Sequence, residues 1–211
     1  MQIELSNITV NVGTENKALF SISRWTLKEG EKLLLKGASG KGKTTFLHLL
    51  AGLFSPSRGE VKVGTFSLDQ MTESERTSFR RRHVGFIFQK LNLIEHLTVL
   101  ENIELATQKA HDHERALSAL KAVGLGGREH ERVSVLSLGE QQRAAVARVL
   151  AGHSSVVFAD EPTSSLDEAN AHEVARLLVE SCRDKTLIVV SHDQRIEKYF
   201  SSIQDFTELT R

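Results

Sequence analysis

The sequence has almost no cysteine, no excess of either charge and no long apolar run. Cys182 is the single cysteine among 211 residues, which excludes an internal disulfide and suits a reducing compartment. We expect it to serve as a small buried hydrophobe. The 27 basic residues equal the 27 acidic residues, so no global field favours nucleic acid or an anionic membrane. Nucleic acid is therefore a poor candidate partner.

A membrane-spanning segment is also missing from the sequence. No apolar run approaches the length of about 18 residues that a transmembrane helix needs. The first residues, Met1 to Glu4, lack the basic-then-apolar pattern of a signal peptide. We therefore expect a cytoplasmic chain that reaches a membrane only through another subunit. The chain length and the 40% hydrophobic content allow one domain with an inserted subdomain.

A glycine-rich segment carries the strongest local signal. It reads Gly37-Ala38-Ser39-Gly40-Lys41-Gly42-Lys43-Thr44-Thr45 and lies between an apolar stretch (32–35) and a helix-forming stretch (46–51). Its glycines let the backbone curl so that N–H groups point inward, and the helix adds its positive N-terminal end. Lys43 would reach the β- and γ-phosphates, and the Thr44 hydroxyl would ligate magnesium. The segment indicates a nucleotide site rather than an ordinary strand-to-helix turn.

The flanking sequence predicts an α/β fold. Residues 3–35 alternate apolar and polar side chains around a break at 13–16, which indicates antiparallel strands joined by a turn. Further strands are expected at 60–63 and 84–88. Residues 91–150 instead carry leucine and alanine at helical spacing, which predicts a small helical subdomain.

Two later apolar runs end in polar side chains. Residues 156–159 end in Asp160 and Glu161, and residues 187–190 end in Ser191-His192-Asp193. Open α/β sheets bind ligands at these carboxyl ends of their strands. Between the two runs, a Ser-x-x-Glu capping box at 137–140 begins a helix, whose N-terminus can bind an anion. His111 and His113 flank Asp112, but with no second cluster of ligands they indicate an exposed helix start rather than a metal site.

In this order the motifs resemble the nucleotide-binding subunit of an ABC transporter, over essentially the whole chain. Residues 37–44 resemble the Walker A loop, and residues 156–161 resemble the Walker B strand. Gln89 matches the Q-loop, residues 136–140 match the signature, residues 164–167 match the D-loop, and His192 matches the switch histidine. Residues 82–102 resemble the lipoprotein-releasing, macrolide-export and cell-division branch. The resemblance implies a single domain, residues 1–211. Residues 1–90 and 151–211 would form a P-loop NTPase core with a mixed sheet and an N-terminal antiparallel β subdomain. Residues of about 91–150 would form an inserted α-helical subdomain.

The resemblance also implies a role for each matching residue. Lys43 neutralises the phosphates of ATP, whereas Thr44, Gln89 and Asp160 hold Mg²⁺. Glu161 acts as general base with Gln89 beside the water, and His192 reaches the γ-phosphate. The implied partners are a transmembrane permease and a second copy of the chain. The two copies meet head to tail, so that Ser137, Gly139 and Glu140 of one close on the ATP of the other, with Asp167 at the seam.

Two positions depart from the family pattern. Leu138 stands where the signature usually has glycine, and Val12 aligns with an aromatic residue that usually stacks on adenine. We expect Leu138 either to make the chain a slow ATPase with weak ATP-driven dimerisation or to stabilise the first helical turn while its side chain points away from the nucleotide.

The apolar side chains beside Gln89 allow two interpretations. They could form a groove for a permease helix or belong to the subdomain core, because exposed patches and core look alike in sequence. The residues concerned are Phe88, Leu91, Leu93, Ile94 and Leu97.

Three functions stay open at this level. The chain could power a transport permease, or drive an envelope or cell-division complex without moving a substrate. It could also be a nucleotide-gated binding module with little turnover.

Overall fold

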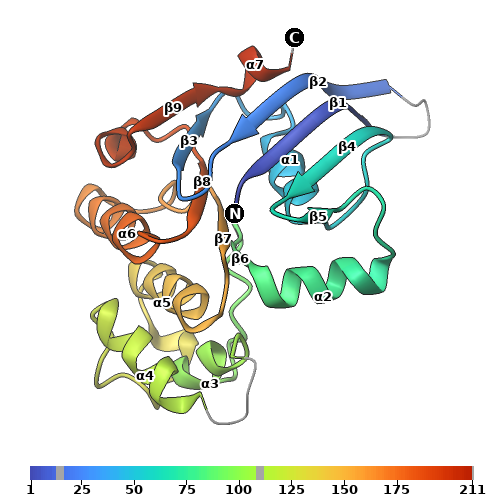
Figure 1. Ribbon diagram of the computed structural model, residues 1–211. Helices are drawn as coiled ribbons and strands as arrows, with labels where there is room; N and C mark the ends of the chain where they lie inside the picture. The colour runs from blue at the N-terminus through green and yellow to red at the C-terminus, as the bar shows by residue number, and fades with distance from the viewer. Residues whose placement is uncertain (13–16, 108–111, 211) are drawn as a thin grey trace.

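The computed structural model describes residues 1–12, 17–107 and 112–210, except for the side chain of Val12. The predicted turn at 13–16, His111 and the side chain aligned with the adenine platform lie outside the described part. Within it, two β-sheets and a helical lobe follow one another along the molecule, as Figure 1 shows.

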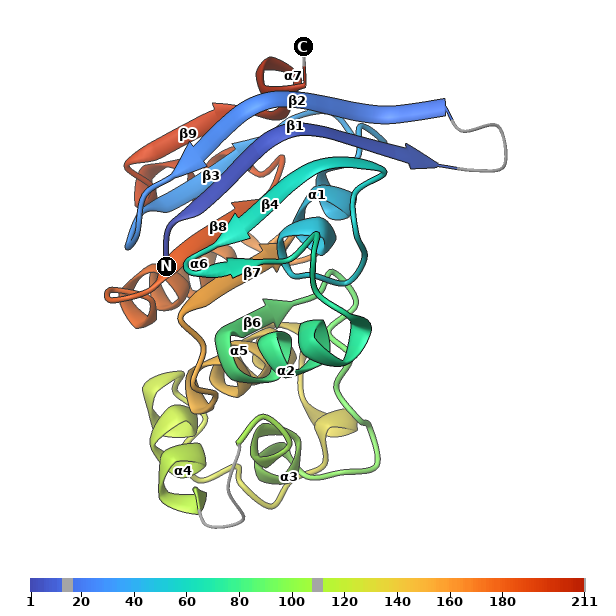
Figure 2. The same cartoon turned by 45° about the vertical axis from the view of Figure 1, so that its right-hand side comes forward.

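The N-terminal strands form an antiparallel sheet, as predicted. Its order is β2-β1-β4-β5, with β1 (Ile3–Val12), β2 (Lys17–Leu27), β4 (Arg58–Val63) and β5 (Phe66–Ser67). In β2 the side chains of Phe20, Ile22 and Leu27 are buried, whereas Ser21, Ser23 and Thr26 are exposed. This alternation places the sheet over α1 (Lys43–Leu50), as Figure 2 shows.

The second sheet has the order β6-β7-β8-β3-β9, and all of its pairings are parallel. Its strands are β3 (Lys32–Lys36), β6 (Val84–Ile87), β7 (Val156–Asp160), β8 (Thr186–Val190) and β9 (Ser202–Asp205). The two sheets correspond to the predicted antiparallel subdomain and the predicted core, whose strands pair only in parallel within the described chain. Every residue of β7 and β8 is buried, which explains their uninterrupted apolar sequences.

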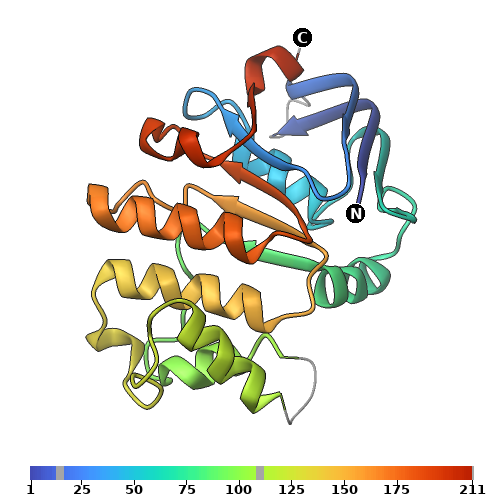
Figure 3. The same ribbon diagram turned by 60° about the vertical axis from the view of Figure 1, so that its left-hand side comes forward.

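The two faces of the parallel sheet carry separate hydrophobic clusters. Val157 and Ala159 of β7 face the helices α5 (Leu138–Ala151) and α6 (Glu168–Ser181), which lie side by side in Figure 3. Val156 and Phe158 face α1 and the antiparallel sheet. Cys182 is buried in the first cluster, as predicted, and burial raises the pKa of its thiol to about 11.

Several helices lie within residues 91–150 of the described chain. There α3 (Val99–Glu104), α4 (His113–Ala122) and η1 (Val133–Val135) pack with α5 into a core that continues onto the parallel sheet. The remaining helical elements are α2 (Glu73–His83), η2 (Gln194–Tyr199) and α7 (Phe206–Leu209). Among the described helices, none combines the length and apolar character needed to cross a bilayer.

Candidate functional site

The carboxyl ends of β3, β7 and β8 meet around one cavity of about 440 Å³. Parallel pairing places these ends at the same edge of the sheet, so residues far apart in sequence line a common space. The lining residues are Leu19, Ser39, Gly40, Gly42, Lys43, Thr44, Thr45, Gln89, Asp160, Glu161, Val190 and His192. Most of the predicted nucleotide, metal and catalytic residues are therefore neighbours.

The glycine-rich loop has the curled backbone that its sequence predicts. Gly37, Gly40 and Gly42 all have positive φ angles, of 146°, 77° and 99°. The Lys43 ammonium lies inside this curve and donates hydrogen bonds to the carbonyl oxygens of Gly37 (2.6 Å) and Ala38 (2.9 Å). Exposed backbone at 38–41 and the first turn of α1 together form a concave surface with N–H groups suited to phosphate.

A hydroxyl and a carboxylate meet below this loop. The Thr44 hydroxyl donates to Asp160 Oδ2 at 2.7 Å, and the other oxygen, Oδ1, is buried without a hydrogen-bond partner. Burial raises the pKa of the Asp160 carboxyl, the Glu161 carboxylate acts in the same direction, and the Thr44 hydrogen bond opposes both. A hard divalent cation prefers such oxygen ligands and would compensate the buried charge, so the pair fits Mg²⁺.

Glu161 and His192 contact each other directly. The Nδ1 atom of His192 lies 2.8 Å from Glu161 Oε1, and the Ser191 hydroxyl donates to Oε2 at 3.0 Å. Glu161 has a φ angle of 48°, a left-handed conformation that costs a non-glycine residue about 1–3 kcal/mol. The strained turn at the end of β7 holds this carboxylate towards the cavity, where a water could be deprotonated.

Sequence reasoning missed the contacts behind this carboxylate. Thr163 is fully buried, and its hydroxyl donates to Asp193 Oδ2 at 2.7 Å. The Arg195 guanidinium also binds the Asp193 carboxylate, and Leu19 of β2 adds an apolar wall to the cavity. The Ser191-His192-Asp193 triplet at a strand end was a usable signal for Asp193, whereas nothing in the sequence pointed to Arg195.

The residues predicted to act in trans lie outside the cavity lining. Ser137 and Glu140 form the predicted capping box of α5, and the backbone N–H of Ser137 donates to Glu140 Oε2 at 2.8 Å. A Cβ atom on Gly139 would lie 2.6 Å from Asn170 Oδ1. Asn170 in turn donates to Asp167 Oδ2 at 2.7 Å, so one side chain links Gly139 to Asp167.

Leu138 begins α5 with its side chain 46% exposed. It lines a groove together with Gln89, Leu91 and Leu93, and this groove contains none of the phosphate-loop residues. Gln89 borders both cavities, which places it between the candidate nucleotide site and the segment that follows it.

The apolar side chains after Gln89 are all half-buried. Leu93 packs against the main core, and the fully buried Asn102 holds the backbone of Ile94 through both its N–H and its carbonyl. Arg148 of α5 donates to the carbonyl oxygens of Leu91 and Asn92, each at 2.8 Å. Leu91 and Leu93 line the groove, and Leu93 also packs against the main core, so the groove and core interpretations both stay predictions.

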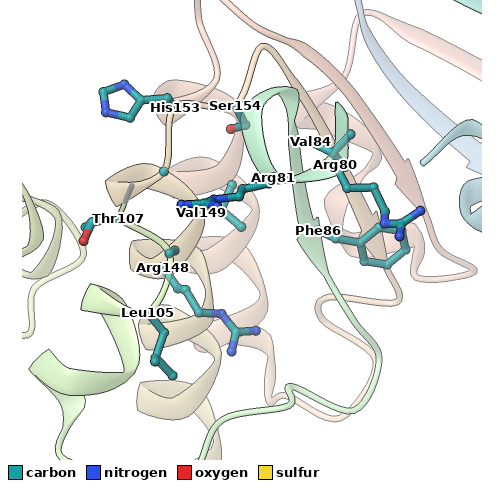
Figure 4. A pocket seen from close by; sticks show the side chains of 13 residues that line it. Arg80, Arg81, Val84, Phe86, Leu105, Thr107, Arg148, Val149, His153 and Ser154 are labelled. Carbon is teal, nitrogen blue, oxygen red and sulfur yellow. The ribbon is translucent and has the colours of Figure 1, made fainter. Parts of the chain in front are cut away.

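A second cavity of about 360 Å³ lies between α2, β6 and the end of α5 (Figure 4). We call it the inter-lobe pocket. Its walls combine apolar and cationic side chains. The apolar residues include Val84, Phe86, Leu105 and Val149, and the cationic residues are Arg80, Arg81 and Arg148; His153 also lines the pocket. Arg148 also donates hydrogen bonds to the carbonyls of Leu91 and Asn92. The same side chain therefore contacts both the pocket and the segment after Gln89.

The parallel sheet, the glycine-rich loop and the strained carboxylate define the class as P-loop nucleoside-triphosphate-binding proteins. A family model described as ABC transporter matches residues 20–164, more than half of the sequence, and the chain belongs to this family. An uncharacterized ABC transporter ATP-binding protein of Methanocaldococcus jannaschii is 40% identical over 95% of this chain and 93% of its own.

Two further relatives carry more specific names. The lipoprotein-releasing system ATP-binding protein LolD of Treponema denticola is 40% identical over 89% of this chain and 86% of its own. The macrolide export ATP-binding/permease protein MacB of Burkholderia thailandensis is 37% identical over 87% of this chain, which spans only 29% of that longer protein.

A solved dimer of the ATP-binding cassette MJ0796, bound to ADP and Pi, superposes with a TM-score of 0.86 at 33% identity, covering 96% and 93% of the two chains. The predicted family and ATPase class are therefore confirmed. This chain is an ATP-binding, ATP-hydrolysing subunit that powers a transmembrane complex.

Proposed function

We propose that this chain is the Mg²⁺-dependent ATPase of an ABC transporter, bound at the cytoplasmic face of the membrane to a separate permease. The observation that carries the proposal is the arrangement around β7. The Thr44–Asp160 hydrogen bond with its unpartnered carboxylate oxygen lies next to the Glu161–His192 pair, in one cavity with the phosphate loop. This combination offers both a metal site and a base.

The residues divide the chemistry between charge neutralisation and water activation. Lys43 offsets charge on the phosphates, and Thr44, Asp160 and Gln89 are the groups that would hold Mg²⁺, which adds further neutralisation when bound. Glu161 accepts a proton from the attacking water. His192 and Ser191 orient that carboxylate through the hydrogen bonds described above.

A second copy of the chain would complete each nucleotide site. Ser137, Gly139 and Glu140 lie outside the cavity of their own chain, at the start of α5, where Ser137 and Leu138 are exposed and a phosphate of a second copy could approach. The dimer of MJ0796 bound to ADP and Pi supports a pair of copies. In this proposal the pair is head to tail, closes on ATP and reopens after hydrolysis. Asp167 would then lie at the seam between the copies.

The permease would contact the inter-lobe pocket and the segment after Gln89. Leu105, which lines the pocket, is 60% exposed and is therefore accessible to another chain. The cationic walls favour a permease segment with acidic as well as apolar residues. The name of MacB, an ATP-binding/permease protein, supports a permease partner. Arg148, which holds the Leu91 and Asn92 carbonyls, would link the pocket to the segment after Gln89.

ATP turnover with a metal control tests the catalytic part. The purified chain should hydrolyse ATP with Mg²⁺ and lose this activity in EDTA. Lys43→Ala should reduce turnover by about 100-fold or more because the phosphate charge is no longer offset. Lys62→Ala on β4 is the matched control, since Lys62 is exposed outside the cavity. Equal turnover of Lys43→Ala and wild type would contradict the proposed site.

Co-purification from native membranes tests the permease part. Leu105→Glu should leave the chain folded but abolish recovery of a membrane partner, while Ile203→Glu on β9, also exposed, should not. Leu93→Glu then decides the role of the segment after Gln89. Unfolding of the isolated chain would favour the core interpretation, and a folded chain without its partner would favour docking.

A further inference from the structure

Arg195 connects the two loops that carry the catalytic pair, although it contacts neither Glu161 nor His192 through a described hydrogen bond. Its Nε and Nη2 atoms donate to the two oxygens of Asp193, at 2.8 and 2.7 Å. The opposite edge of the guanidinium donates to the carbonyl oxygens of Leu166 (3.0 Å) and Thr163 (3.3 Å). One side chain thus joins the end of β8 to the segment after β7.

The segment that Arg195 holds is the 161–167 loop. Leu166 N–H donates to the Thr163 carbonyl at 3.1 Å, so these residues form a turn, and the guanidinium binds the carbonyls at both ends of it. The loop begins at Glu161, whose backbone is strained, and ends at Asp167, whose side chain accepts from Asn170 N at 2.9 Å to begin α6. A strained position persists only where its surroundings hold it.

The contact needs an arginine. A planar guanidinium can bind a carboxylate with two parallel hydrogen bonds and still present donors on its other edge, whereas an ammonium group is a compact point charge. The Asp193 side chain is only 6% exposed, so the ion pair is shielded from water more than a surface pair. The Asp193 carboxylate also accepts from Thr163, which closes the network.

We propose that Arg195 is a positioning residue for ATP hydrolysis. It keeps the 161–167 loop in register with the loop of His192, so that Glu161 stays aimed at the water and Asp167 stays presented to the second copy. This inference rests on the proposed roles of Glu161 and Asp167. Arg195 does not line the nucleotide cavity and makes no described hydrogen bond to Lys43 or Thr44. Its loss therefore slows the chemical step and spares nucleotide binding by the single chain.

The test compares Arg195→Lys and Arg195→Ala with wild type in the full chain. We expect kcat to fall about tenfold or more in both variants, while the Kd for ATP stays within about twofold, because misplacement of a catalytic group affects kcat first. In a Glu161→Gln background, Arg195→Lys should also weaken the ATP-driven dimer. Arg176→Lys is the control, since Arg176 on α6 pairs only with Glu180 on the same helix among the described contacts.

Three results would overturn the proposal. The first is a kcat of the Arg195 variants within about twofold of wild type, and the second is a Kd for ATP that rises as much as kcat falls. The third is a loss of Arg195→Lys activity that equals the fraction of this variant that is unfolded in thermal denaturation. The Arg176→Lys control distinguishes failure of the Arg195 proposal from failure of the proposed ATPase function. Wild type and Arg176→Lys that both lack turnover would remove the ATPase assignment itself, whereas normal turnover with an unaffected Arg195→Lys removes only the role of Arg195.

Discussion

Glu161 combines a strained backbone with a carboxylate that is held on both oxygens. Its side chain is 11% exposed and receives hydrogen bonds from Ser191 and from the His192 ring. A carboxylate in this position is fixed in direction but keeps an open side towards the cavity. This geometry suits proton transfer from one bound water better than coordination of a metal, which is why we assign metal binding to Asp160.

The first prediction at this scale concerns the base. Glu161→Gln should leave ATP binding intact and slow hydrolysis by about 100-fold or more, because the amide cannot accept the proton. Turnover and ATP affinity are measured on the same preparation, and size-exclusion chromatography with ATP and Mg²⁺ should show a trapped dimer. Hydrolysis at the wild-type rate would mean that another group is the base.

The second prediction concerns the buried charge of Asp160. Burial raises the pKa of this carboxyl in the folded chain, so as pH rises the unfolded state loses its proton first and the folded state is progressively destabilised. Asp160→Asn removes this effect. The variant should melt at a higher temperature than wild type at neutral pH without nucleotide, and the difference should shrink on acidification towards the usual range of an aspartate.

Calorimetry across that pH range checks the prediction. With ATP and Mg²⁺ added, the order should reverse, because only wild type gains stability from bound metal. A variant that is less stable than wild type at neutral pH without ligand would show that the Thr44 hydrogen bond outweighs the desolvation of the charge.

At the scale of elements, the packing of α5 on α6 depends on a residue without a side chain. Gly139 lies so close to α6 that a Cβ atom would come within 2.6 Å of Asn170 Oδ1. The Asn170 amide is also held by Asp167 and by Arg143, so it has little freedom to move away. The start of the signature helix is therefore fixed relative to the end of the 161–167 loop.

The third prediction follows from this contact. Gly139→Ala should lower the free energy of unfolding by about 1–3 kcal/mol, because overpacking forces a shift of α5 or of Asn170. Urea denaturation of Gly139→Ala, Asn170→Gly and the double variant forms a cycle in which the double variant should recover part of the loss. Full additivity of the two changes would show that the two residues do not compete for the same space.

At the scale of the whole molecule, we expect Leu138 to affect how closely two copies of the chain can approach each other. Its side chain is 46% exposed at the start of α5, so it packs little within its own chain. A leucine there would occupy space between two copies, although it suits a helix better than glycine by up to about 1 kcal/mol. Whether it obstructs closure depends on contacts between chains.

The fourth prediction is that Leu138→Gly raises both ATP turnover and the affinity of the ATP-driven dimer. The added backbone freedom and the lost bulk let the helix start approach a phosphate more closely. Analytical ultracentrifugation with ATP in the Glu161→Gln background gives dimer affinity, and kcat is measured without that change. No change, or a fall in both quantities, would show that the leucine is accommodated and the site is fully competent.

The sequence by itself determined the local chemistry of this protein. The loop at 37–45, the capping box at 137–140 and the buried strands that lead to Asp160 and His192 were predictable, because each depends on residues close together in the chain. Glycine conformations, helix capping and apolar periodicity are local properties, and they also gave the antiparallel strands and the helical range.

Only the tertiary structure decided which distant groups meet. The order of the parallel sheet, with β8 and β9 on the two sides of β3, is specified by no local pattern. The contact of Arg195 with Thr163 and Leu166, and that of Gly139 with Asn170, join segments about thirty residues apart. Such contacts depend on how whole helices and strands pack, because side-chain packing and not sequence spacing sets the distance between them.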